Sequence, residues 1–224
     1  MKKLLIILLL CHHGLVAGAQ EITMDLGNFS EVEVTNGLLV NFIQAEENKA
    51  VIIGFSRDKV KIEVENGILN IHTDLNKIWN EDNTLIIIYY KNLQKIEAKR
   101  NAKLELCGKI TQPLIRFEVQ EGSDITANIK VNNLIARIST GGNLRIIGNA
   151  DVQEIEVMAA GKFKGENLVG ESIDVNISAG GMANVNATNY VNAKVNAGGN
   201  IYIYGNPVKV DKTTTFGGKI TKIN

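Results

Sequence analysis

Residues able to do chemistry are scarce in this sequence. After the first nineteen residues it holds one histidine, His72, and one cysteine, Cys107. A histidine-based triad or a zinc site needs further partners, and only Asp74 stands beside His72 in the sequence. Cys107 has no basic neighbour to lower its pKa, which favours a packed or interface thiol. The sequence therefore predicts no catalytic residue, no metal site, no cofactor and no enzymatic activity.

Two tyrosines are the strongest candidates for a contact surface. Tyr202 and Tyr204 alternate with Ile201 and Ile203, and Tyr190 is nearby in the sequence. If the isoleucines point into a core, both tyrosines point out of it. Exposed tyrosines suit contacts with sugars or proteins, although they can equally cover a lateral face or cap the fold.

A pair of basic residues is the second candidate. Arg145 and Lys164 stand 19 residues apart, and the repeat described below brings them side by side as a small basic patch. The alternative is a charged face that only keeps the protein soluble. The outward positions around them mix acidic, basic and neutral residues, without the paired carboxylates that a β-helical polysaccharide lyase or hydrolase needs.

Small-residue pairs at regular intervals determine which side chains face out. The steps between the first members of successive pairs, starting from residue 101, are 21, 19, 19, 20, 18 and 19 residues. A fixed period of this kind is the signature of a repeat architecture. The pairs are Asn101–Ala102, Gly122–Ser123, Gly141–Gly142, Ala160–Gly161, Gly180–Gly181, Gly198–Gly199 and Gly217–Gly218.

Apolar residues flank each pair at fixed offsets. They stand five and three positions before the first member of a pair and two and four positions after its second member, with mostly polar residues between them. Around residues 141–142 these apolar residues are Ala136, Ile138, Leu144 and Ile146. This alternation on both sides of a small-residue corner predicts two half-buried strands per repeat. Stacked repeats bury the apolar face, and glycine at the corner permits positive φ and close backbone approach.

The predicted fold is all-β: a single-chain parallel β-helix with Gly–Gly corners and about 19 residues per coil. With coils about 4.8 Å apart, seven of them make a rod about 30 Å long. An antiparallel sandwich with Gly–Gly hairpins is the competing fold, because two-residue hairpin loops also favour glycine. The near identity of successive repeats favours the solenoid.

The N-terminal part is less regular, as expected for the atypical end coils of a solenoid. Here Val32, Val34, Val40 and Phe42 flank Gly37 in the repeat pattern. The further elements expected are a hairpin or tight coil over residues 60–71, a polar loop over 73–83 and a buried strand over 85–90.

The first nineteen residues have the three-part pattern of a secretory signal peptide. Two lysines precede a short apolar run, and small residues lead to a cleavage site between Ala19 and Gln20. A lipoprotein signal ending at Cys11 is disfavoured because Leu10 is not small. The apolar run is shorter than the about 20 residues that span a bilayer, so no transmembrane segment is expected in the mature chain. We expect a signal peptide over 1–19 and one domain over 20–224.

The charge balance limits the classes of partner. The chain has 24 basic and 24 acidic residues, and loss of Lys2 and Lys3 with the signal peptide leaves a net charge of about −2. This balance argues against nucleic acid or an anionic membrane as the main partner. With Cys107 as its single cysteine, the mature chain cannot form an internal disulfide.

Several segments resemble the putative auto-transporter adhesin head GIN-domain family of bacteria. The resemblance runs from about Phe29 to the C-terminus and rests on FSEVEVTNGLLVNFIQ, VKIEVENGILNIHT, VNISAGGMANVNA and AKVNAGGNIYIYGNPVKVDKTTTFGGKI. In this chain the family's small-residue turn is Gly–Gly instead of Gly–Ser–Gly. The resemblance implies a parallel β-helix, export and an adhesive surface role, and it supplies no catalytic residues.

Together these features predict a non-enzymatic protein that is periplasmic, outer-membrane-associated or secreted, and that contacts an unidentified protein or glycan of the cell envelope. One alternative is an envelope β-helix that binds or processes carbohydrate. Another is a structural polymer whose solenoids stack end to end.

Overall fold

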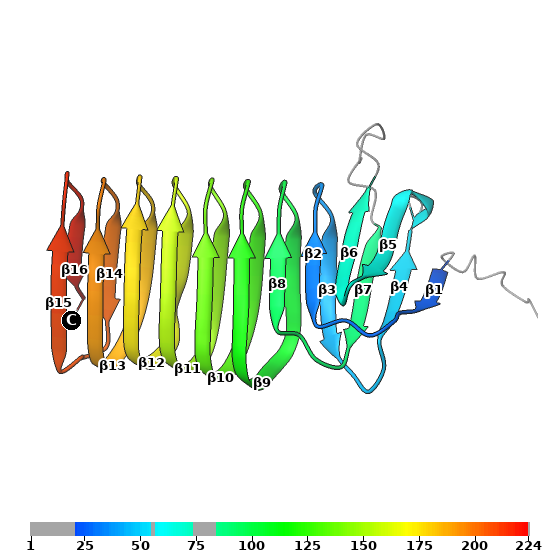
Figure 1. The fold of residues 1–224 in the computed structure, drawn as a ribbon, viewed down its shortest axis with the longest axis horizontal. Helices are drawn as coiled ribbons and strands as arrows, with labels where there is room; N and C mark the ends of the chain where they lie inside the picture. Colours follow the sequence, from blue (N-terminus) through cyan, green and yellow to red (C-terminus); the bar gives the residue numbers. More distant parts are fainter. Residues whose placement is uncertain (1–20, 55–56, 74–83, 224) are drawn as a thin grey trace, which may run out of the picture.

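The structure, a computed structural model, describes residues 21–54, 57–73 and 84–223. In these ranges the chain is almost entirely β, with a single 3₁₀ turn at Arg57–Lys59. The strands stack side by side along one axis, so the molecule is a rod with coils perpendicular to its length (Figure 1). The signal-peptide cleavage site between Ala19 and Gln20 and most of the expected 73–83 loop lie outside the described residues.

The C-terminal coils form a parallel β-helix, which confirms the predicted fold and makes the antiparallel sandwich wrong for this part of the chain. Each central coil is one long bent strand, and neighbouring strands pair in parallel. The prediction of two strands per repeat was therefore wrong in detail, because the ladder continues around the bend. These strands are β9 (Lys103–Val119), β10 (Asp124–Ile138), β11 (Asn143–Met158), β12 (Lys162–Ser178) and β13 (Met182–Val195).

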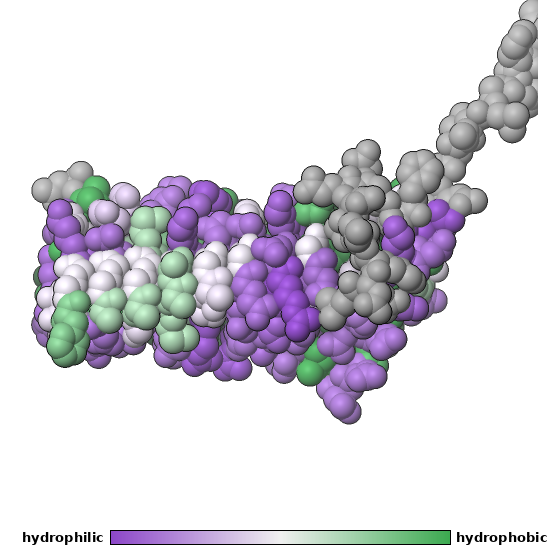
Figure 2. Space-filling model, turned by 90° about the horizontal axis from the view of Figure 1, so that it is seen from above, coloured by the Kyte–Doolittle hydropathy of each residue, from purple (hydrophilic) through white to green (hydrophobic). Residues whose placement is uncertain are grey.

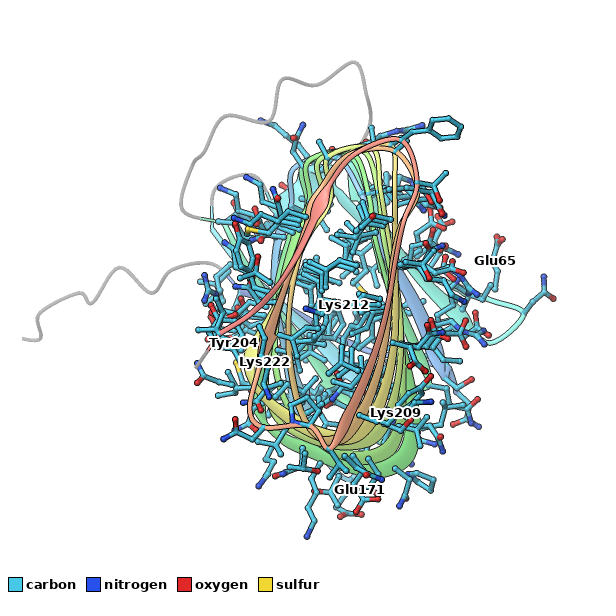
Figure 3. All side chains as sticks on the ribbon, turned by 90° about the vertical axis from the view of Figure 1, so that its left-hand side faces the viewer. Glu65, Glu171, Tyr204, Lys209, Lys212 and Lys222 are labelled. Atoms are coloured by element: carbon cyan, nitrogen blue, oxygen red, sulfur yellow. The ribbon has the colours of Figure 1, made fainter. Side chains whose placement is uncertain are left out.

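The last coils are divided into shorter strands. β14 (Asn200–Tyr204) and β16 (Lys219–Lys222) continue one side of the solenoid, and β15 (Lys209–Thr214) continues the other. Viewed along the axis, the coils superpose as a flattened oval with two long sides (Figure 3). We call them the β14 face, which holds the first half of each long strand, and the β15 face, which holds the second half.

The core fills the interior between the two faces. The residues predicted to point inward around residues 141–142, namely Ala136, Ile138, Leu144 and Ile146, are all fully buried. The same offsets in the other coils are buried as far as Ile203, within one continuous hydrophobic cluster. Burial of each aliphatic side chain contributes about 1.5–3 kcal/mol, so the stacking of coils supplies the stability that a single coil lacks.

The corners around residues 101, 122, 141 and 160 are four-residue turns with two consecutive residues of positive φ, the combination found in type I′ turns. In one of them φ is 48° at Thr140 and 73° at Gly141. Gly142 follows with ordinary φ, but a Cβ there would lie 2.3 Å from the carbonyl oxygen of Val119 in the preceding coil. Gly141 thus serves backbone conformation, whereas Gly142 permits close approach of successive coils. In the three later corners the second glycine, which is Gly181, Gly199 or Gly218, has positive φ as well.

Seen from above, these turns form a ridge along the molecule (Figure 2). Over the C-terminal coils the ridge is pale and built from small exposed residues such as Ala159 and Ala179. Over earlier coils it is charged, and the Arg100 Nε lies 3.7 Å from Glu121 Oε2. The predicted turn glycines Gly161, Gly180, Gly181, Gly198, Gly199, Gly217 and Gly218 all lie along this ridge.

The N-terminal end mixes parallel and antiparallel pairing. Residues 60–71 form the hairpin that was one of the two predicted alternatives, with β5 antiparallel to β6, and residues 85–90 form the predicted buried strand β7. The antiparallel pairs β1–β4 and β4–β7 were not predicted. The strands are β1 (Glu21–Asp25), β2 (Glu31–Val34), β3 (Leu39–Gln44), β4 (Lys49–Ile53), β5 (Val60–Glu65), β6 (Ile68–Thr73), β7 (Leu85–Tyr90) and β8 (Lys95–Ala98).

Candidate binding surface

The predicted contact residues come together on the β14 face. Parallel pairing places Arg145 of β11 opposite Lys164 of β12, and Lys164 opposite Asn184 of β13. Asn184 in turn pairs with Tyr202 of β14. Adjacent strands are about 4.8 Å apart, so Arg145 and Tyr202 lie about 14 Å apart in one row across four coils.

A second, shorter row lies beside the first. Tyr204 pairs with Asn186 of β13, two residues along the strand from the Tyr202–Asn184 pair. Ile201 and Ile203 are fully buried, which leaves both tyrosines on the outside of the face. Figure 3 shows Tyr204 at the outer side of the ribbon. We call this surface the lateral strip: Arg145, Lys164, Asn184, Asn186, Tyr202 and Tyr204.

Glu166 organises the polar side chains of the lateral strip. Its side chain accepts a hydrogen bond from Asn184 Nδ2 at 3.1 Å, and its Oε1 lies 4.0 Å from Arg145 Nη1. The Glu166 main-chain carbonyl accepts a hydrogen bond from Asn186 Nδ2 at 2.8 Å. Both asparagines are therefore held in place, whereas Lys164 forms no ion pair within the described part of the chain. The strip itself carries two positive charges, and Glu166 beside it reduces the local net charge to plus one.

Tyr190 does not belong to this surface. It pairs with Lys209 on the β15 face, and its hydroxyl donates a hydrogen bond to Asp211 at 2.9 Å. The Lys209 ammonium lies 5.3 Å from the centre of the Tyr190 ring and 2.9 Å from Asp211. The hydrogen bond to Asp211 raises the pKa of Tyr190. Proximity in sequence was misleading here, because the position within a coil decides the face.

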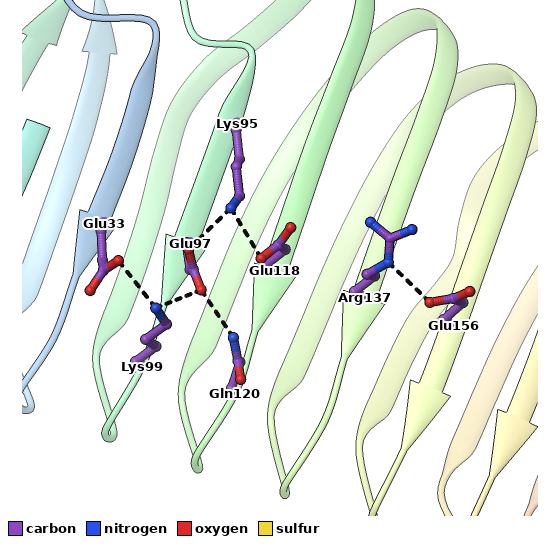
Figure 4. A network of polar contacts seen from close by, with 8 residues as sticks. All are labelled: Glu33, Lys95, Glu97, Lys99, Glu118, Gln120, Arg137 and Glu156. Atoms are coloured by element: carbon purple, nitrogen blue, oxygen red, sulfur yellow. Dashed lines mark hydrogen bonds and ion pairs between the residues drawn. The ribbon is translucent and has the colours of Figure 1, made fainter. Parts of the chain in front are cut away.

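A polar network occupies the β15 face at the N-terminal coils (Figure 4). Its centre is Glu97, whose side chain is only 10% exposed. Glu97 accepts hydrogen bonds from Lys95 at 3.2 Å and Gln120 at 3.0 Å, and it forms an ion pair with Lys99 at 2.8 Å. Burial raises the pKa of the Glu97 carboxyl, but the hydrogen bonds from Lys99 and Lys95 outweigh it and lower the pKa overall. Mutual pairing gives this network a structural role.

A groove of about 670 Å³ borders the same network. His72 lines it together with Glu63, Asn70 and Arg100. Thr35 and Thr73 add two hydroxyls to the lining, and Lys99 on its edge is paired with Glu33 at 3.1 Å. His72 thus lies among polar and charged side chains of the groove, and its role as an ordinary polar residue stays a prediction.

Cys107 lies half-buried on the β14 face, in β9. Burial raises the pKa of its thiol, and nearby Glu105 adds to the effect. A thiol that holds its proton is a weak nucleophile, which fits a packed thiol better than a reactive one.

Two further features bear on function. Across residues 21–54, 57–73 and 84–223 no three side chains of histidine, cysteine, aspartate or glutamate are grouped so as to hold a metal ion. Within those residues no helix is long and apolar enough to cross a membrane.

Several solved structures have a similar fold. A putative adhesin from Bacteroides fragilis superposes with a TM-score of 0.82 at 19% identity, over 91% of this chain and 97% of that one. A putative adhesin from Parabacteroides distasonis gives 0.74 at 18% identity, over 91% and 96%. A putative lipid binding protein from the same species gives 0.72 at 17% identity, over 92% and 96%. At these identities the likeness shows the fold alone.

Sequence comparison identifies the family. No curated protein is significantly similar to this chain. The family described as "Putative auto-transporter adhesin, head GIN domain" matches residues 28–207, which include the lateral strip and most of the β-helix. The resemblance noted in the sequence is thereby confirmed, and the chain belongs to this adhesin head GIN-domain family.

Proposed function

We propose that this protein is an exported, non-enzymatic adhesin-like β-helix that binds a partner of the cell envelope through its lateral strip. The family supports a surface role, and the signal-peptide pattern of residues 1–19 supports export. The solenoid acts as a rigid support that presents side chains at fixed spacing.

The observation that carries this proposal is the convergence of two tyrosines, two amides and two basic side chains on one flat face. Tyrosine and arginine are the residue types that contribute most at protein contact sites, because they combine large apolar area with hydrogen bonding. Asn184 and Asn186 are fixed by Glu166, so little side-chain entropy is lost when a partner binds them. Lys164 is left to meet an acidic group of the partner.

The opposite face supplies a matched control. Arg145→Ala, Lys164→Ala and Tyr202→Ala remove one arginine, one lysine and one tyrosine from the lateral strip. Arg137→Ala, Lys194→Ala and Tyr190→Ala remove the same three residue types from the β15 face. Both triple variants change the net charge equally and leave the core intact.

The test is a pull-down from the native envelope fraction with tagged mature protein, followed by affinity measurement with the captured partner. A glycan array run in parallel separates a glycan partner from a protein partner. We expect the strip variant to lose at least about tenfold in affinity and the control variant to bind as the parent does. Equal loss in both variants, or loss in the control alone, would contradict the proposal.

A further inference from the structure

The last coil departs from the core pattern at its inward positions. Lys212 stands opposite Ala193 in the ladder, and Lys222 stands opposite Ile203. Ala193 and Ile203 are fully buried, whereas both lysines are exposed at the end of the rod. Each of these two inward positions is therefore occupied by a lysine in the last coil and mostly by apolar residues in the coils before it.

Lys212 lies across the open end of the solenoid. Its ammonium reaches from β15 to the other face and donates a hydrogen bond to the carbonyl of Ile220 in β16, at 3.5 Å. Figure 3 shows it in the middle of the oval, over the end of the core. A lysine in this position can cover apolar side chains with its methylene groups while its charge remains in water. Beneath it, Val210 and Ile220 are only partly buried.

The strands of this coil have free edges within the described residues. β15 pairs only with β13, and β16 pairs only with β14. The N–H groups of Thr215, Lys219 and Ile223 bond back to the preceding coil, so those of alternate residues such as Lys222 point away from it. A row of unpaired backbone groups is a template for another strand unless something prevents its approach.

We propose that Lys212 and Lys222 close this end of the stack and prevent a further parallel coil, including one from a second copy of the chain, from adding to it. A coil placed on β15 and β16 would enclose both ammonium groups between apolar layers. Burial of an unpaired charge is costly, so inward lysines oppose edge pairing even where the edge itself is exposed.

Within the described residues, the other end of the rod presents apolar side chains to these lysines. Its outermost inward-facing side chains are Ile22 and Met24 of β1 and Ile62 and Val64 of β5. Head-to-tail stacking of two copies would place lysine against apolar side chains. Stacking of two C-terminal ends would place lysine against lysine. Both arrangements are therefore opposed by the same two residues.

Sedimentation velocity on the purified protein and three variants tests this proposal. Lys212→Ile with Lys222→Ile removes the inward charges. Lys209→Ile with Lys219→Ile removes the same charge from the same two strands at outward positions. We expect the inward variant to self-associate at least about 100-fold more strongly than the outward variant, because stacking no longer buries two charges.

A third variant shows whether association uses the strand edge. Lys212→Ile with Lys222→Pro also removes both inward charges, but proline at the free edge takes away an N–H that a new strand would need. We expect it to sediment as the parent does, and circular dichroism verifies that each variant is folded. Equal association of the inward and outward variants, no association of the inward variant, or unchanged association of the proline variant would overturn the proposal.

Discussion

The turn at residues 139–142 allows the stacking of coils to be tested with two neighbouring glycines. Gly141 has φ +73°, and a Cβ there meets no atom within 4 Å. Gly142 has ordinary φ, but its Cβ would lie 2.3 Å from the Val119 carbonyl oxygen and 3.1 Å from the Gln120 nitrogen. The same substitution to alanine therefore tests backbone conformation at one site and close approach of coils at the other.

The expected sizes differ clearly. Gly141→Ala forces an L-residue into the left-handed region and should lower the free energy of unfolding by about 1 kcal/mol. Gly142→Ala pushes a methyl group into the main chain of the preceding coil, which cannot move without disturbing its own ladder. An overpacking cost of about 3 kcal/mol is expected, at the upper end of the usual range.

Thermal unfolding followed by circular dichroism measures the difference. For a chain of this size about 1 kcal/mol corresponds to about 2–4 °C in Tm, so Gly142→Ala should melt about 4–8 °C below Gly141→Ala. Hydrogen exchange should also show lost protection at the amides of Gln120 and Asn143, which bond across successive coils. The explanation of the glycine pair is refuted if Gly142→Ala is as mild as Gly141→Ala or milder.

Two further predictions concern the polar network and the core. Glu97→Gln should lower the free energy of unfolding by about 2 kcal/mol at pH 7, because a buried carboxylate loses its charge-assisted bonds from Lys95 and Lys99. The pKa of Glu97 is lowered from 4.5 by folding. Its stabilisation is thus fully present above that value and lost as pH falls through the folded pKa. In urea titrations the gap between Glu97→Gln and parent should close in acid; a constant gap would exclude the charge as its cause. Gly165→Ala should cost about 2 kcal/mol, since its Cβ would clash with the Phe163 ring, and it should cost less beside Phe163→Leu. Purely additive losses in thermal unfolding would contradict this.

The parallel coils could be predicted from the sequence because their physical cause is periodic. Each coil repeats one corner and one pattern of apolar residues. Arg145, Lys164 and Tyr202 could therefore be assigned to equivalent outward positions of different coils, and the structure has them there. The antiparallel strands β1 and β4 have no corner of this kind. Their pairing depends on how the chain closes the end of the core, which no local pattern records.

The part played by Glu166 was missed for a different reason. The register of β12 is irregular between Lys164 and Leu168 against β11 and between Lys164 and Val169 against β13. Glu166 therefore has no paired residue in either neighbouring coil. The step from 160 to 180 has twenty residues, one more than the commonest step of 19, and was a signal of this extra residue. Asn184, in contrast, has the same outward position in its coil as Lys164 and Tyr202 have in theirs, and only its amide chemistry was overlooked.

The lateral strip is the central element of the proposed function, and hydroxyl-radical footprinting with the captured envelope partner tests it most directly. Tyrosine side chains are readily oxidised, and the two faces carry Tyr202 and Tyr204 on one side and Tyr190 on the other. We expect the partner to protect Tyr202 and Tyr204 and to leave Tyr190 as reactive as in the free protein. Protection of Tyr190 alone, or no protection of the two strip tyrosines at saturating partner, would contradict the assignment of this face as the binding surface.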